Sequence, residues 1–214
     1  MKENSFVLII EDHPLYKQAL VSLLKLSFPD HKVLAYNSAE EAFNFLKTQG
    51  NDVISRSLTL LDLTLPGLSG LELVSQMHHE YPDLQIAVIS GSNDRVRVGA
   101  CLGAGARAFI CKSTPPDRIV ELIGRALREV LSEPVWLTSE GQEDLKDVPK
   151  IHLTDRQIMV LGLVCQGYTN KQIAEHTDTV EATAKAHVSA ILRELGVESR
   201  TQAVLAAQKL GLYN

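Results

Sequence analysis

Short apolar runs rich in β-branched residues alternate with longer stretches of helical periodicity through the first 130 residues of the chain. Parallel strands need a crossover connection, usually a helix, and strands covered on both faces read as continuous apolar runs. The alternation therefore predicts an α/β fold, a parallel sheet with helices on both faces. Five strands are expected at 6–10, 32–36, 58–61, 85–89 and 107–110, and helices near 14–27, 39–49, 70–80, 94–103 and 115–131.

The chain changes character after residue 130. Residues 131–149 contain two prolines, one glycine and a net charge of −4, which is typical of a linker. Beyond them no run is typical of a strand, and four amphipathic segments are predicted near 154–166, 169–176, 180–195 and 199–210. We therefore expect an α/β domain at 1–130, an acidic linker at 131–149 and an all-α domain at 150–214.

The composition excludes several classes of protein. The chain is 45% hydrophobic and 22% charged, with a formal net charge of −5, as in ordinary globular proteins. A spanning helix needs about 20 apolar residues, which the sequence lacks, and nothing resembles a secretory signal, so a cytoplasmic location with no membrane partner is expected. The cysteines Cys101, Cys111 and Cys165 lie in apolar neighbourhoods without a C-x-x-C motif, which favours buried small side chains over a disulfide framework or a metal cluster.

Polar residues stand at the carboxyl ends of the predicted strands. Glu11 and Asp12 follow the first strand, Asp62 ends the third, Ser90 ends the fourth and Lys112 follows the fifth. In an open parallel sheet, ligands bind beyond these ends where the strand order reverses, which for the order 2-1-3-4-5 gathers the three carboxylates. Carboxylates so placed repel one another unless a divalent cation neutralises them, and oxygen ligands suit Mg²⁺.

Such a site suits phosphoryl chemistry. One carboxylate can act as a nucleophile towards a phosphoryl group, while Lys112 stabilises charge on the phosphoryl oxygens and Ser90 hydrogen-bonds one of them. Each residue alone has a simpler explanation, since an Asp often caps a helix, a Ser often begins one and a Lys is often a solvated charge. Their joint placement at successive strand ends favours the functional interpretation.

At this point the sequence resembles a known family. The run LDLTLPGLSG at 61–70, with the acidic pair before it and Ser90 and Lys112 after it, resembles the flavodoxin-like receiver domain of two-component response regulators over about residues 5–130. The resemblance implies that Asp62 accepts a phosphoryl group from a histidine kinase. It also implies the ligands of Mg²⁺, which are Glu11, Asp12, Asp62 and the backbone carbonyl of Thr64.

The same resemblance assigns the remaining receiver residues. Lys112 is implied to pair with the phosphoryl group, and Ser90 to be the hydroxyl that reorients after phosphorylation. Phe109 takes the family's switch-aromatic position, although a plain core role fits it almost equally well. Glu11 stands where Asp is frequent, which lengthens the carboxylate arm and keeps the charge.

The segment near 180–195 is a candidate second helix of a helix-turn-helix. Its side chains at 184, 188, 191 and 195 are apolar at helical spacing and should be buried. The opposite face is small and basic, and its members are Ala182, Lys185, Ala186, Ser189 and Arg193. Such a face can approach a major groove, although an amphipathic helix with two basic residues is more often a solvated surface.

The order of residues is more specific than that face. LTDRQ at 153–157, GYTNKQIA at 167–174, TAKAHV at 183–188 and LGV at 195–197 resemble the LuxR-type helix-turn-helix over about residues 150–212. The resemblance makes 180–195 the recognition helix, with Lys185, Ala186 and Ser189 facing bases. Thr183, Asn170 and Lys171 are implied contacts to the DNA backbone.

Together the two resemblances predict a phosphorylation-controlled, DNA-binding transcription regulator of the NarL/FixJ type. The expected partners are a histidine kinase and double-stranded promoter DNA. The net charge of +1 after residue 149 favours weak binding by a monomer, so a homodimer is the expected active form. No enzymatic activity is expected beyond slow self-dephosphorylation.

Two other functions stay open. The receiver could be an interaction module that needs no phosphorylation, or the last domain could bind a protein, because Thr177 and Ala184 replace larger apolar residues under the recognition helix. A phosphohydrolase with an aspartate nucleophile would share the crevice. Thr64 stands where such an enzyme would carry its second acidic residue, which argues against that reading.

Overall fold

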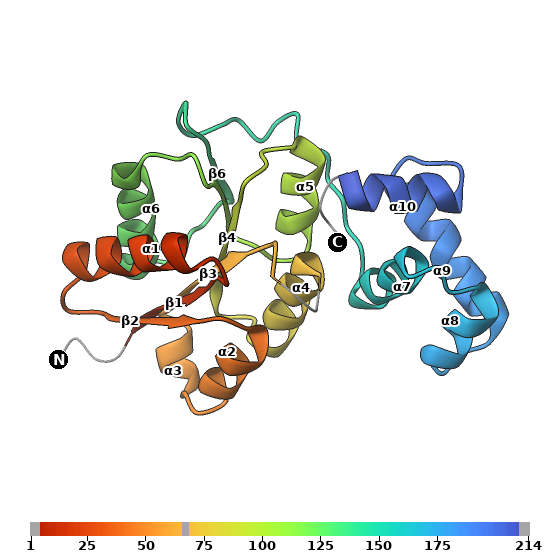
Figure 1. The fold of residues 1–214 in the computed structure, drawn as a ribbon, viewed down its shortest axis with the longest axis horizontal. Coiled ribbons are helices and arrows are strands. Elements are labelled where there is room, and N and C mark those ends of the chain that lie inside the picture. The colour runs from red at the N-terminus through yellow and green to blue at the C-terminus, as the bar shows by residue number, and fades with distance from the viewer. Residues whose placement is uncertain (1–4, 66–68, 210–214) are drawn as a thin grey trace.

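The computed structural model describes residues 5–65 and 69–209. Its N-terminal unit is built on a six-stranded parallel sheet with the order β2-β1-β3-β4-β5-β6 (Figure 1). The strands are β1 (Phe6–Ile10), β2 (Lys32–Tyr36), β3 (Leu58–Asp62), β4 (Gln85–Ser90), β5 (Ala108–Cys111) and β6 (Val135–Leu137). The five predicted strands and their order are confirmed.

Helices cover both faces of this sheet. They are α1 (Pro14–Ser27), α2 (Ala39–Leu46), α3 (Asn51–Ile54), α4 (Gly70–Glu80), α5 (Arg95–Gly103) and α6 (Pro116–Arg128). Alternate residues of β1 enter different cores: Leu8 packs with α2, α4 and α5, whereas Ile9 packs with α1 and α6. Because both faces are covered, β1, β3, β4 and β5 are buried throughout, which explains their continuous apolar runs.

Two elements depart from the sequence prediction. The short helix α3 was not among the predicted elements, and β6 lies inside the segment expected to be an acidic linker. All three side chains of β6 are buried, and the strand pairs with β5 in parallel. Three apolar residues between acidic and proline-containing stretches give too short a pattern to predict a strand.

The C-terminal unit contains α7 (Asp155–Cys165), α8 (Asn170–His176), α9 (Glu181–Glu194) and α10 (Arg200–Lys209), within one or two residues of the predicted bounds. Thr154 caps the start of α7 and forms a reciprocal capping box with Gln157. Gly167 follows α7 with φ +85°, a conformation that favours glycine, and ends the helix. The short connection between α8 and α9 completes the helix-turn-helix.

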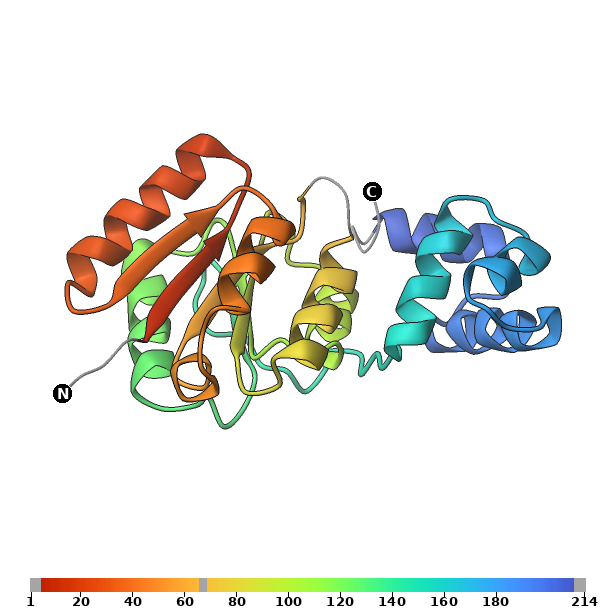
Figure 2. The same ribbon diagram turned by 90° about the horizontal axis from the view of Figure 1, so that it is seen from below.

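The two units pack against each other through α4 and α7 (Figure 2). The Ser75 hydroxyl donates a hydrogen bond to Asp155 Oδ1, and His79 Nδ1 lies 3.4 Å from Asp155 Oδ2. One continuous cluster of buried apolar side chains runs from the sheet through α4 and α5 to the helices of the C-terminal unit. Within the described ranges, no helix has both the length and the apolar character needed to cross a membrane.

Candidate functional site

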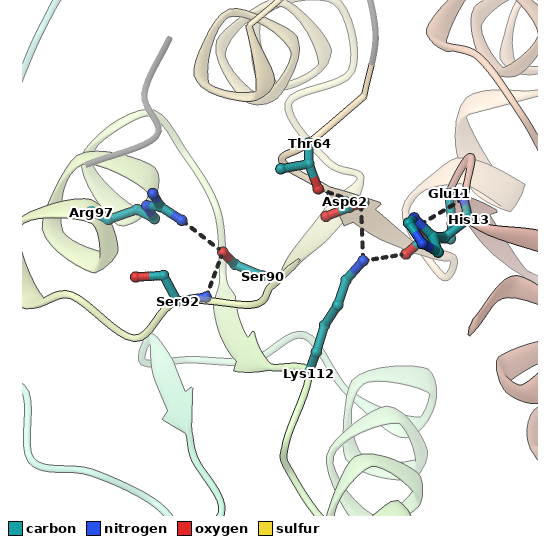
Figure 3. Close-up of polar contacts among 8 residues, drawn as sticks. All are labelled: Glu11, His13, Asp62, Thr64, Ser90, Ser92, Arg97 and Lys112. Carbon is teal, nitrogen blue, oxygen red and sulfur yellow. Dashed lines mark hydrogen bonds and ion pairs between the residues drawn. The ribbon is translucent and has the colours of Figure 1, made fainter. Parts of the chain in front are cut away.

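The carboxyl ends of the strands bring Glu11, Asp62 and Lys112 together, as the sequence predicted (Figure 3). Lys112 Nζ donates hydrogen bonds to Glu11 Oε2 at 2.9 Å and to Asp62 Oδ2 at 3.0 Å. The two carboxylate side chains are 2% and 1% exposed, so the ammonium group compensates two buried negative charges. Such charge-assisted bonds fix the geometry of all three groups.

Asp62 keeps one carboxylate oxygen without a hydrogen bond. Its Oδ2 accepts from Lys112 and also from the Thr64 hydroxyl at 2.7 Å. Its Oδ1 is buried and has no hydrogen-bond partner among the described residues. A buried carboxylate oxygen without a hydrogen-bond donor is costly unless a cation compensates it, which makes Asp62 a candidate reactive group.

The acidic pair after β1 lies beside this centre. Ligand atoms of Glu11, Asp12 and His13 all lie within 4.8 Å of one another. The backbone N–H of His13 donates to Glu11 Oε1 at 3.0 Å, which orients the buried carboxylate. Asp62 is not part of that group, but it shares Lys112 with Glu11. The fourth predicted ligand, the carbonyl of Thr64, belongs to the residue whose hydroxyl donates to Asp62.

The charges of this crevice depend on one another. Burial raises the pKa of Glu11, and the charge of Asp62 adds to that effect, although the bonds from Lys112 and His13 oppose it. Burial acts to lower the pKa of Lys112, but the hydrogen bonds to Glu11 and Asp62 outweigh it and leave that pKa raised. Lys112 therefore stays an ammonium group at neutral pH.

Ser90 and Phe109 belong to β4 and β5, the next two strands of the sheet. The hydroxyl of Ser90 is turned towards α5, where it accepts hydrogen bonds from Ser92 N at 3.3 Å and Arg97 Nη1 at 3.1 Å (Figure 3). Phe109 is fully buried in β5 and packs in the core shared with α4 and α5. The switch roles of both residues stay predictions.

Sequence reasoning missed three residues of the site: His13, Tyr16 and Arg97. The ring of Tyr16 lies under Lys112, with Nζ 4.7 Å from the ring centroid. Burial raises the pKa of Tyr16 to about 12, with the charges of Glu11 and Asp62 adding to the effect. All three lie beyond the strand ends, where no sequence spacing indicates which side chain returns to the crevice.

The recognition-helix prediction can be checked by burial along α9. Ala184, Val188 and Ile191 are buried, as the helical spacing predicted, whereas Leu195, just after the helix, is only half-buried. The opposite face is exposed, and its members are Ala182, Lys185, Ala186, Ser189 and Arg193. This division of the helix confirms the two faces, whereas the contacts with DNA stay predictions.

The predicted backbone contacts lie at the starts of α8 and α9. Lys171 is exposed, while Asn170 and Thr183 are half-buried. Arg200 Nη1 donates to Asn170 Oδ1 at 3.3 Å, so the amide is oriented by α10. Thr177 is buried under this region, and its hydroxyl donates to the Ile173 carbonyl at 2.7 Å, which offsets the cost of a polar group in that position.

Comparison with known proteins identifies both units. The family described as "Response regulator receiver domain" matches residues 7–124, and the family described as "Bacterial regulatory proteins, luxR family" matches residues 152–207. The chain belongs to the response regulators with a LuxR-type output domain. It is a transcription regulator controlled by phosphorylation, with a receiver and a helix-turn-helix domain in one chain.

Several curated response regulators resemble this one over nearly their whole length. The glycerol metabolism activator of Pseudomonas putida is 34% identical, with 94% of each chain covered. The nitrate/nitrite response regulator protein NarP of Escherichia coli is 32% identical, covering 93% of this chain and 92% of the relative. The match of full-length relatives agrees with the two-domain organisation of this response regulator.

A solved structure supports the fold of the response regulator. RcsB from Salmonella enterica serovar Typhimurium, bound to a promoter in the presence of the phosphomimetic BeF3⁻, aligns with a TM-score of 0.59. The alignment covers 97% of this chain and 99% of that one at 19% identity. At that identity the likeness shows the fold.

Three residues of the 61–70 motif, Pro66, Gly67 and Leu68, lie outside the described residues.

Proposed function

We propose that Asp62 is the phosphoacceptor of this response regulator and that a histidine kinase is the donor. The observation that carries the proposal is the state of the Asp62 carboxylate, which is buried, held by Lys112 and Thr64 at one oxygen and unpaired at the other among the described residues. A carboxylate in this arrangement is fixed in place and keeps a lone pair for attack.

The chemistry is a transfer of the phosphoryl group. The Asp62 carboxylate forms a new P–O bond as the P–N bond of the kinase's phosphohistidine breaks, and the released imidazole takes up a proton. Lys112 holds its ammonium group 3.0 Å from Asp62, where it stabilises negative charge on the phosphoryl oxygens. Slow hydrolysis of the acyl phosphate returns the resting state, and no other turnover is proposed.

The donor set around Asp62 fits Mg²⁺. Glu11, Asp12 and Asp62 offer carboxylate oxygens, Thr64 offers its carbonyl, and Oδ1 of Asp62 is a buried oxygen to which no described residue donates. Hard oxygen donors are those that Mg²⁺ prefers. When bound, the ion would neutralise the carboxylates and stabilise charge on the phosphoryl group.

The C-terminal domain is proposed to bind double-stranded promoter DNA through α9. Lys185, Ala186 and Ser189 lie on its exposed face, where they can meet base edges in the major groove. Contacts to the DNA backbone are assigned to Thr183, Asn170 and Lys171, and Arg193 is placed to reach base edges or phosphates. Two copies would read two half-sites, so the active form is a homodimer in the cytoplasm, where kinase and DNA are both accessible.

The proposed division of the chain keeps the receiver at 1–130, the connecting segment at 131–149 and the DNA-binding domain at 150–214. The pairing of β6 with β5 adds part of the connecting segment to the receiver sheet. The rest of that segment leads to α7. The switch residues Ser90 and Phe109 belong to β4 and β5, the strands nearest this connection.

DNA binding after phosphorylation tests this function. A DNA site is selected from a random-sequence library with protein treated with a small acyl-phosphate donor and Mg²⁺, and its affinity is then measured by fluorescence anisotropy. Treatment should raise the affinity of the wild type and leave Asp62→Asn unchanged. Lys185→Ala should bind weakly in both states, and equal binding by treated and untreated wild type would contradict the proposal.

A further inference from the structure

The hydroxyl of Ser90 is already engaged before any phosphoryl group arrives. It accepts one hydrogen bond from the Ser92 backbone and another from the Arg97 guanidinium, and both donors lie on the side of α5 (Figure 3). We propose that Arg97 is a positioning residue that holds Ser90 in its resting orientation and so opposes the switch. This inference rests on the proposed function of Asp62.

Arg97 is well placed to hold a hydroxyl. It lies in the first turn of α5, and the Asp94 side chain caps that turn by accepting hydrogen bonds from Val96 N and Arg97 N. Arg97 is half-buried, and Ser90 is 2% exposed. A charged donor to a buried acceptor forms a stronger hydrogen bond than a neutral pair does, so the contact favours the present direction of the Ser90 side chain.

The direction of the contact decides its effect. Figure 3 shows Asp62 and Lys112 on one side of Ser90 and Arg97 on the other. Ser90 must turn towards Asp62 to bond a phosphoryl oxygen, and this movement weakens or breaks the 3.1 Å contact with Arg97. The Arg97–Ser90 contact stabilises only the resting state. It therefore lowers the affinity of the protein for a phosphoryl group or analogue that favours the switched state.

Arg97 acts through Ser90, and this separates it from residues that meet the phosphoryl group directly. Loss of Lys112 should weaken phosphoryl binding, because its ammonium is bonded to Asp62. Loss of Arg97 should strengthen that binding. The two cations therefore have effects of opposite sign, which a general loss of stability would not produce.

The test measures the apparent Kd of beryllofluoride, a phosphoryl analogue, at saturating Mg²⁺ by titration calorimetry. Arg97→Ala should bind the analogue about threefold to tenfold more tightly than the wild type, the range expected for losing one half-exposed charged hydrogen bond. Arg97→Lys, which keeps a charged donor, should fall between them. Arg56→Ala removes an exposed arginine from a turn and should match the wild type.

A double-mutant cycle shows whether the effect passes through the hydroxyl. In a Ser90→Ala background, Arg97→Ala should change the Kd by less than twofold, because the partner is already absent. Weaker or unchanged binding of beryllofluoride by Arg97→Ala would overturn the inference. So would an equal change in Kd on Arg97→Ala in the wild-type and Ser90→Ala backgrounds. A wild type that binds no beryllofluoride would contradict the proposed function itself and the inference with it.

Discussion

Lys112 is the residue on which the charge balance of the crevice depends. Its ammonium group bonds two carboxylates that are almost completely buried, and the side chain itself is 23% exposed. Removing one partner from a buried ion pair leaves an uncompensated charge, which costs more than the pair contributes when intact. The same lysine lies over Tyr16, so the aromatic ring helps to hold it in place.

Lys112→Ala should therefore lower the free energy of unfolding by about 2–4 kcal/mol at pH 7, measured by urea denaturation. The loss should shrink in Mg²⁺, because a bound cation compensates Glu11 and Asp62. The loss of unfolding free energy should also shrink on acidification. Without Lys112, the pKa of Glu11 in the folded protein rises further above its unfolded value. Protonation of Glu11 at low pH then favours the folded state and removes the uncompensated charge. Lys146→Ala, which removes an exposed ion pair with Asp144, should leave the free energy of unfolding unchanged within error.

Cys101 makes the stability of the protein sensitive to alkaline pH. Burial raises the pKa of this thiol from 9.0 to about 12. Its contribution is complete below the unfolded pKa and is lost as pH rises towards the folded pKa, because the unfolded chain ionises first. Between pH 9 and pH 11, the unfolding free energy of the wild type should fall by about 2 kcal/mol more than that of Cys101→Ala. An equal decrease of the unfolding free energy with pH in the two proteins would contradict a raised pKa of the Cys101 thiol.

At the scale of elements, the recognition helix begins without a side-chain cap. Its N-cap residue is Val180, which is 67% exposed and makes no capping hydrogen bond, whereas Thr154 and Thr169 cap α7 and α8 with complete capping boxes. The first amide groups of α9 are therefore left to water or to a ligand. The element that is proposed to read DNA is the one whose start is least fixed within its domain.

Val180→Ser should stabilise the C-terminal domain by about 0.5–1 kcal/mol, because serine can accept a hydrogen bond from an amide of the first turn. Val180→Ala is the matched control, since it shortens the exposed apolar side chain without adding an acceptor. Thermal unfolding of the full chain, followed by a probe in α9, measures the effect. Equal stability of the serine and alanine variants would mean that the first backbone N–H groups of α9 gain nothing from a side-chain acceptor at position 180.

The elements were largely predictable from the sequence, and the reason is physical. Strands covered on both faces leave a continuous apolar run, so β1, β3, β4 and β5 were evident, as were helices with an apolar face such as α6. The strand β6 was missed because its three apolar residues are too few to show a strand or helix periodicity. Arg97 was missed because its contact with Ser90 depends on the path of the loop at 91–94 between β4 and α5, which no spacing in the sequence encodes.

At the scale of the whole molecule, the receiver contacts the output domain in two places. Its helix α4 packs against α7, and its helix α5 packs against the residues just before α7. The carbonyl groups of Pro149 and Ile151 lie directly against Gly99 and Gly103 of α5, where an added Cβ would come within 2.0 Å and 1.8 Å of the two oxygens. The exposed face of α9 with Lys185 and Arg193 is not covered in this arrangement. In this arrangement the receiver does not mask those side chains of the recognition helix.

Gly103→Ala should loosen this attachment, because the new methyl group displaces the backbone at Ile151. Limited proteolysis should cut the segment between the domains several times faster than in the wild type, while the receiver stays folded. Gly124→Ala is the control: it also adds a methyl group to a helical glycine, but the nearest atoms lie 3.4 Å away at the ends of side chains. Equal cleavage of the two variants would mean that the glycine contact does not hold the domains together.

The central claim is that Asp62 accepts the phosphoryl group in a site completed by Mg²⁺ and Lys112. The intact mass of the full chain after incubation with a small acyl-phosphate donor tests it most directly, with and without Mg²⁺, for wild type and Asp62→Asn. A single phosphoryl adduct that requires Mg²⁺ and is absent from Asp62→Asn is the predicted result. An adduct of equal yield on Asp62→Asn, or no adduct on the wild type with either this donor or a histidine kinase, would contradict the account.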